Sequence, residues 1–188
     1  MFDRFKKAFN RPNEDSSEEA TVSWLRGAYR LHKESDVTHF TALAAAAFPA
    51  MQNRIRCFGA DWLGRQFATD FERIVGGEPQ VLMLEPGTGE VLEVPRNFSS
   101  FHQSEMAEQP DAVVANSFFE TWLATGGVAP NYDQCVGYKQ PLFLGGMDDI
   151  TNLHITDFDV YWTISAQLLA QVRGLPESTR VSIVGIDD

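Results

Sequence analysis

The densest group of side chains that could do chemistry lies within residues 148–159. Four aspartates and one histidine share this stretch: Asp148, Asp149, His154, Asp157 and Asp159. Paired carboxylates can bind a divalent cation or divide acid–base work, and a histidine can bind a metal or carry a proton. His154 and Asp157 also form an H-x-x-D string, although a four-residue pattern that fixes two positions occurs easily by chance. A metal or acid–base site is therefore one hypothesis that these residues permit.

The same residues also suit ordinary structural roles. Asp157 and Asp159 stand where a segment with helical periodicity begins, and a carboxylate there stabilises the positive end of the helix dipole. Asp148 and Asp149 follow two glycines, which is typical of a turn. The sequence contains no G-x-S-x-G, H-E-x-x-H or P-loop string. We therefore expect no catalytic residue, no metal site and no cofactor.

The cysteines and two of the other histidines are isolated along the chain. Cys57 and Cys135 lie far apart and neither belongs to a C-x-x-C string, which gives little support to a disulfide framework or a zinc site. We expect both to be reduced thiols in the core. His32 and His39 have no partner at ligand spacing, so surface or capping roles are expected for them.

The charge of the chain is strongly acidic and unevenly distributed. The net charge is −11, of which residues 105–188 contribute −9 and residues 1–104 contribute −2. Lysine and arginine side chains bind nucleic acids and anionic membranes by displacing the counterions of those surfaces, and an acidic protein offers few such side chains, so neither is an expected partner. A basic protein partner fits this charge better, although acidity for solubility alone is an open alternative.

The first twenty residues and the lengths of the apolar runs suggest a soluble protein with an appended N-terminal segment. Phe2, Phe5 and Phe9 have helical spacing, and residues 11–20 are polar and read as a linker. No apolar run approaches the length that spans a bilayer, and the first residues lack the order of a signal peptide. We expect a cytoplasmic protein with no stable membrane insertion, in which residues 1–20 are flexible or dock on a partner.

Hydrophobic periodicity predicts helices first and strands next. Residues 21–50 predict two helices, the first around Trp24 to Leu31 and the second from about Asp36 or Thr38 to Pro49. Residues 55–95 change to short apolar runs typical of strands. Residues 86–90 (PGTGE) predict a hairpin; a phosphate cradle is the rival, but no G-K-[ST] follows.

The second half of the chain predicts further elements and completes the fold class. Helices are expected over 97–106 and 112–124, a strand over 136–144, and a long helix that begins with a capping box from Thr156 to Asp159. Residues 180–186 are short and β-prone, and two alternatives are open for them, an edge strand or a loose tail. The tryptophans, which lie within apolar patterns and so are expected in the core, are Trp62, Trp122 and Trp162. We predict one α+β domain over 21–188: a mixed, mainly antiparallel sheet flanked by helices, with a single core.

Five strings in one order also resemble a bacterial domain family. They are 58–67 (FGADWLGRQF), 84–90 (LEPGTGE), 101–102 (FH), 137–146 (GYKQPLFLGG) and 160–162 (VYW). Over about residues 55–172 the chain resembles the C-terminal domain of type VI secretion immunity proteins that guard against DNase effectors, and its layout is loosely similar to the SUKH immunity class. The resemblance implies a sheet flanked by helices, no chemistry of its own, and tight binding to one cognate toxin, usually over the toxin's active site.

The sequence therefore favours an immunity protein whose partner is a basic toxin, most simply a nuclease. A nuclease needs a basic cleft for its substrate, and an acidic protein complements such a cleft. The candidate toxin-binding residues, chosen on charge density, are Asp148, Asp149, Asp157 and Asp159, with Glu120 and Asp133 as outer members. The alternative is a non-catalytic interaction or scaffold module of a phage or bacterial defence system.

Overall fold

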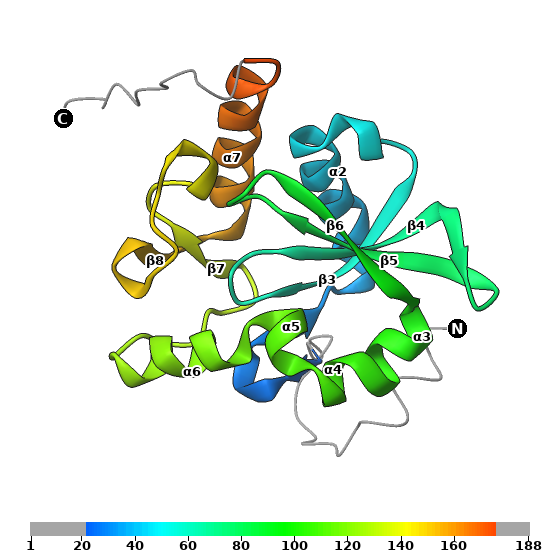
Figure 1. Ribbon diagram of the computed structural model, residues 1–188, viewed down its shortest axis with the longest axis horizontal. Coiled ribbons are helices and arrows are strands. Elements are labelled where there is room, and N and C mark those ends of the chain that lie inside the picture. Colours follow the sequence, from blue (N-terminus) through cyan, green and yellow to red (C-terminus); the bar gives the residue numbers. More distant parts are fainter. Residues whose placement is uncertain (1–21, 176–188) are drawn as a thin grey trace.

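A computed structural model describes residues 22–175 and centres on a six-stranded sheet (Figure 1). The strands are β1 (Ser23–Trp24), β2 (Tyr29–Leu31), β3 (Ile55–Asp61), β4 (Gln66–Val75), β5 (Glu78–Glu85) and β6 (Glu90–Asn97). Each strand pairs with the next one along the chain, and every pairing is antiparallel. The α+β class expected from the sequence is confirmed, with a sequential meander as its sheet.

Tight turns allow this meander. Gly76 and Gly77 join β4 to β5 with φ angles of +59° and +83°, the left-handed conformations that a two-residue hairpin turn requires. The hairpin predicted at residues 86–90 is confirmed, because it connects β5 to β6. β5 is buried from Gln80 to Leu84, so both faces of the sheet must be covered.

Helices cover the two faces and divide the core into two apolar clusters. Along β5, Val81 and Met83 belong to one cluster, while Leu82 and Leu84 belong to the other, as the alternation of a strand demands. The first cluster packs under a run of short helices: α3 (Phe98–Ser100), the π-helical turn η4 (Phe101–Glu105), α4 (Met106–Glu108), α5 (Pro110–Val114) and α6 (Asn116–Ala124). The second packs under α2 (Val37–Ala47) and α7 (Phe158–Val172), which lie side by side (Figure 1). The result is three layers, with the sheet in the middle.

A second, two-stranded sheet stands beside the main one. It consists of β7 (Gln134–Tyr138) and β8 (Leu153–Asp157), which pair antiparallel, and β8 leads directly into α7. Short 3₁₀ turns fill several connections: η1 (Leu25–Gly27), η2 (Glu34–Asp36), η3 (Pro49–Met51), η5 (Leu142–Leu144) and η6 (Ile150–Asn152). The strand predicted over 136–144 is therefore shorter than expected and begins earlier, and β8 was not anticipated.

The first helix predicted within residues 21–50 is wrong. Leu25, Arg26 and Gly27 have φ angles of +51°, +60° and +100°, and three successive left-handed residues cannot continue an α-helix. The apolar residues before and after them form β1 and β2 instead. The second helix is confirmed: α2 has Asp36 as its N-cap and ends two residues before Pro49.

Two further predictions concern the ends of the chain. Those for residues 1–20 and for a strand over 180–186 lie outside the described residues. Within residues 22–175, no helix combines the length and the apolar character needed to cross a bilayer.

Candidate functional site

Four of the five strings that carry the family resemblance meet at one buried junction, here called the motif joint. It brings together the β3–β4 turn (residues 61–66), the β5–β6 hairpin (residues 85–90), β7 and the first turns of α7. Trp62 and Trp162 are fully buried within it. The indole Nε1 of Trp62 donates to the Val114 carbonyl at 2.9 Å, and that of Trp162 donates to the Gly64 carbonyl at 2.8 Å. Each tryptophan therefore fastens its own element to a distant one.

Backbone contacts and glycines complete the motif joint. The Leu142 N–H donates to the Gly87 carbonyl at 2.8 Å, which ties the segment after β7 to the hairpin. A Cβ atom on Gly87 would lie 2.7 Å from the Tyr138 ring, and one on Gly137 would lie 2.6 Å from the Tyr161 ring. The aromatic rings thus pack directly on the backbone at both places. These family-like strings build a packing junction between the two sheets and α7.

A buried ion pair lies at the motif joint. The Arg65 Nε donates to Asp61 Oδ2 at 2.6 Å, and the Arg65 backbone N–H donates to Asp61 Oδ1 at 2.9 Å. Burial raises the pKa of Asp61, and the Arg65 guanidinium opposes that rise. Arg65 also donates to the Val113 carbonyl at 3.2 Å, so the pair links the β3–β4 turn to α5. This pair shapes a turn, which is a structural role.

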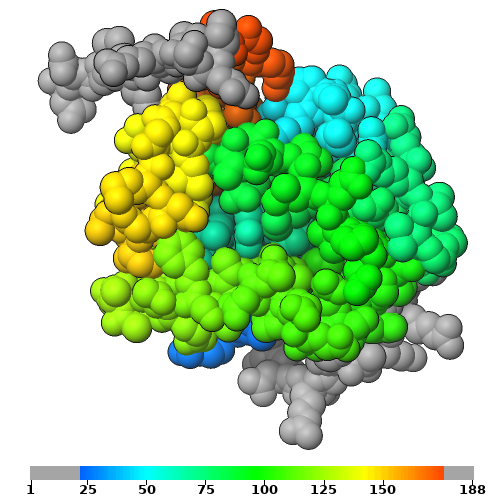
Figure 2. Space-filling model, viewed as in Figure 1, coloured from blue at the N-terminus to red at the C-terminus, as the bar shows by residue number. Residues whose placement is uncertain are grey.

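Carboxylates gather where the motif joint reaches the surface. The Tyr138 hydroxyl donates to Asp148 at 2.6 Å. Glu85 is half-buried, and burial, together with the charges of Asp61, Asp148 and Glu90, raises its pKa, against the attraction of Arg65. Figure 2 shows the surface recessed between the segment of residues 140–150, the β5–β6 hairpin and α6. The two segments that carry Asp148 and Glu85 therefore border a hollow on this face of the molecule.

The structure separates the acidic residues that are neighbours in the sequence. Asp148 and Asp149 lie in the connection from β7 to β8, whereas Asp157 and Asp159 lie at the opposite end of β8. The length of β8 alone, about 13 Å at roughly 3.3 Å per residue, stands between the two pairs. Among residues 22–175 there is no group of three or more His, Cys, Asp or Glu side chains that could hold a metal ion.

Most of these carboxylates already have a hydrogen-bond or ion-pair partner within the protein. Asp149 accepts the backbone N–H of Thr151 at 2.8 Å, and Asp157 accepts that of Val160 at 2.9 Å, so both cap helical turns. The Asp159 carboxylate is 2.7 Å from His39 Nε2, and the Glu120 carboxylate is 3.0 Å from an Arg26 guanidinium nitrogen. Asp133 differs from them: its side chain is exposed and makes no hydrogen bond or ion pair within residues 22–175, while its carbonyl accepts the Phe158 N–H at 2.8 Å.

The H-x-x-D string does not form a pair of cooperating side chains. His154 and Asp157 are three residues apart on β8, and side chains at odd spacing point to opposite faces of a strand. The Nδ1 atom of His154 is buried and has no hydrogen-bond partner among the described residues. Burial and the nearby Lys139 lower the pKa of His154.

The isolated cysteines, histidines and tryptophans are mostly placed as predicted. Cys57 and Cys135 are buried free thiols, and burial raises the pKa of Cys57 to about 12. Trp62 and Trp162 are core residues, as expected, while Trp122 is half-buried. His39 lies at the surface.

The surface role predicted for His32 is wrong. Its ring is buried and stacks on Phe40 with 4.0 Å between centroids, and its Nε2 is 3.3 Å from the Gln66 amide oxygen. Burial, and then the charge of Arg30, lowers the pKa of His32 to about 3. A histidine in a segment that becomes a strand next to α2 is covered by that helix, which the helical prediction for residues 24–31 could not foresee.

Comparison with known proteins agrees with the resemblance. Residues 96–169 match the family described as T6SS immunity protein Tdi1, C-terminal, where T6SS denotes the type VI secretion system. The fold is similar to the crystal structure of Atu4351 from Agrobacterium tumefaciens, with a TM-score of 0.55, 13% sequence identity and 89% of each chain covered. No curated protein matches the chain.

The matched residues run from the end of β6 to the last turns of α7, which is narrower than the 55–172 expected. They include three of the five strings, those at 101–102, 137–146 and 160–162. The strings at 58–67 and 84–90 lie outside the match but pack against it at the motif joint. The resemblance is thus confirmed over residues 96–169, which are similar to the C-terminal region of a type VI secretion immunity protein.

Proposed function

We propose that this protein is an immunity protein of the bacterial cytoplasm that binds one cognate secreted toxin, a nuclease effector, and occludes its active site. The observation that carries the proposal is the family match over residues 96–169. The protein acts by binding and needs no metal or cofactor of its own.

The charge of the chain supports a basic partner. The net charge is −11, and most of it belongs to residues 105–188, which contain nearly all of the matched region. A nuclease presents a basic cleft to its substrate, and opposite fields accelerate encounter and favour the right partner. The same acidity disfavours nucleic acid as a direct partner.

Two acidic regions are proposed for the toxin-binding surface. The first contains Asp133, Asp157 and Asp159 at the start of α7, where the free carboxylate of Asp133 lies next to two that are locally engaged. The second contains Asp148 and Asp149, from a segment that borders the recess, together with Glu85 and Glu90 from the β5–β6 hairpin. Glu120, on α6, is an outer member. A basic side chain of the toxin that entered the recess would meet the raised density of negative charge there.

The decisive experiment is neutralisation of a toxin in cells. The toxin encoded beside this gene is expressed alone and together with the full chain, and survival and chromosomal DNA integrity are measured. Rescue of both, together with recovery of that toxin as a basic protein when the tagged chain is pulled down at low salt, is the expected result. Rescue from a toxin that leaves DNA intact would remove the nuclease part of the proposal. Failure to rescue, with no basic protein retained, would favour a scaffold module instead.

A further inference from the structure

Arg30 is a buried cation that lacks an anionic partner. It lies on β2 with 4% of its surface exposed. Its Nη2 donates to the Gln134 carbonyl at 2.7 Å, and its guanidinium carbon lies 5.3 Å from the centroid of the Phe158 ring. The Nε and Nη1 atoms are buried and have no hydrogen-bond partner among residues 22–175. Three of its five N–H groups are therefore left unsatisfied.

No described carboxylate bonds directly to this cation. Asp61 and Asp133 attract Arg30 electrostatically, but Asp61 is already bonded to Arg65, and Arg30 forms no ion pair with any residue that the structure describes. Burial lowers the pKa of Arg30, yet an arginine stays protonated in proteins. A buried charge is strongly unfavourable unless it is paired and hydrogen-bonded, so the site lacks an anion.

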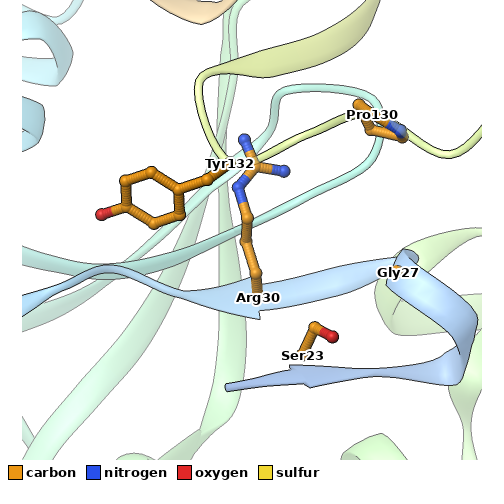
Figure 3. Close-up of a pocket in the computed structure, with 5 residues that line it drawn as sticks. All are labelled: Ser23, Gly27, Arg30, Pro130 and Tyr132. Carbon is orange, nitrogen blue, oxygen red and sulfur yellow. The ribbon is translucent and has the colours of Figure 1, made fainter. Parts of the chain in front are cut away.

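A cavity of about 190 Å³ adjoins Arg30 (Figure 3). Its lining residues are Ser23, Gly27, Arg30, Pro130 and Tyr132. Figure 3 shows the Arg30 side chain running from β2 toward the loop that carries Pro130 and Tyr132. The Lys33 ammonium lies 4.8 Å from the centroid of the Tyr132 ring and adds a second positive charge nearby. Such a volume corresponds to roughly six water molecules, which is enough for a small oxyanion and some of its hydration.

We propose that this cavity binds a small oxyanion, a carboxylate or a phosphate group, with Arg30 as its principal ligand. A planar guanidinium presents parallel N–H groups that match two oxygens of either anion. Ser23, which pairs with Arg30 on the neighbouring strand, also lines the cavity, and its hydroxyl supplies a further donor. The oxyanion can come from a free ion or from an acidic group of a bound protein, because both present the same oxygens.

The test titrates the full chain with sodium phosphate and with sodium acetate, against sodium chloride at equal ionic strength. Isothermal titration and the thermal unfolding midpoint are the readouts. We expect saturable binding of at least one oxyanion, with a rise in the midpoint that chloride does not reproduce. Arg30→Gln and Ser23→Phe should each weaken binding about tenfold or more. Arg26→Gln, which removes an exposed arginine outside the cavity, should leave binding unchanged.

Two results would overturn the proposal. The first is the absence of saturable binding of either oxyanion to the wild-type chain, which would leave water as the content of the cavity. The second is full binding by Ser23→Phe, which would place the ion elsewhere. Ser23→Phe fills the cavity from an exposed strand and keeps Arg30, so it decides the matter even if Arg30→Gln does not fold. Weaker binding of the cognate toxin in phosphate or acetate would assign the site to an acidic group of the toxin, and unchanged toxin binding would assign it to a free ion.

Discussion

Two arginines on this chain show how differently a charge behaves when its surroundings change. Arg65 pairs with Asp61, whose side chain has no exposed surface, and the pair holds the β3–β4 turn against α5. Arg26 pairs with Glu120 at the surface, where both side chains are largely exposed. Removing one partner of a buried pair leaves the other as an uncompensated charge, whereas water replaces a lost surface partner.

Arg65→Gln is therefore expected to lower the free energy of unfolding by about 3 kcal/mol or more. Arg26→Gln, the matched control, should cost less than about 1 kcal/mol because solvent already screens that pair. Urea denaturation followed by tryptophan fluorescence measures both. Similar small losses in the two variants would mean that water compensates Asp61 once Arg65 is removed.

His32 gives a pH dependence with a definite sign. Burial and the charge of Arg30 hold its folded pKa at about 3, while an unfolded chain has a pKa near 6.5. Below pH 6.5 the unfolded state binds a proton that the folded state does not, so stability is complete above that pH and declines as the pH falls. At pH 4.5 the loss due to His32 should be roughly 2.7 kcal/mol, and His32→Gln should make this part of the profile less steep by that amount. A slope should remain, because burial also lowers the pKa of His102, to about 4. His39→Gln, at an exposed histidine, should keep the wild-type slope; a parallel profile in both variants would refute the assignment.

At the scale of elements, the start of α7 shows what a sequence pattern leaves open. Thr156 and Asp159 have the spacing of a capping box, yet the N-cap is Asp157, which accepts the Val160 N–H. Thr156 belongs to β8 and pairs with Cys135. Asp157→Ala should cost about 1 kcal/mol of stability. Thermal unfolding measures both variants, and Thr156→Ala should cost clearly less. A larger loss for Thr156→Ala than for Asp157→Ala would mean that Thr156 caps the helix, as the sequence predicted.

Other elements were predictable where local rules decide the conformation. The β5–β6 hairpin and the end of α2 follow from Gly and Pro chemistry within a few residues. The segment around Trp24 to Leu31 was wrongly predicted as a helix because a short apolar run suits a helix or a strand equally well. The three left-handed residues that exclude a helix there are visible only in the folded chain. β8 was missed because its pairing with β7 depends on a partner strand that lies fifteen or more residues away along the chain.

The candidate site was less predictable than the fold. Charge density along the sequence grouped Asp148, Asp149, Asp157 and Asp159, but β8 holds the two pairs at opposite ends. Asp133 and Asp157 show the converse, since they lie far apart in sequence order yet meet where β7 and β8 join α7. Arg30 belongs to no sequence motif, so the sequence could not single it out. Only its burial beside a cavity distinguishes it from the other arginines.

At the scale of the whole molecule, the family match covers one helical layer, the small sheet and α7 and leaves out most of the meander. The motif joint ties these parts together, so the region similar to an immunity protein depends on the rest of the chain for its shape. Variants that probe toxin binding should therefore spare the joint. They should also spare the carboxylates that cap helical turns, because losing a cap lowers stability as well as charge.

Asp133 meets these requirements and gives the sharpest test of an acidic binding face. Its carboxylate is exposed and makes no hydrogen bond or ion pair in the described part of the chain, and it attracts Arg30 only electrostatically. Asp133→Lys should reduce the association rate with the cognate toxin about tenfold at low salt and weaken its salt dependence, because a charge at the rim of an interface acts mainly on encounter. Glu108→Lys, an equal charge reversal at an exposed position ending α4, should change the rate less than about twofold. Stopped-flow association across a salt series measures both variants. Equal effects would assign the attraction to net charge alone, whereas an effect confined to Asp133 would locate the toxin at the start of α7.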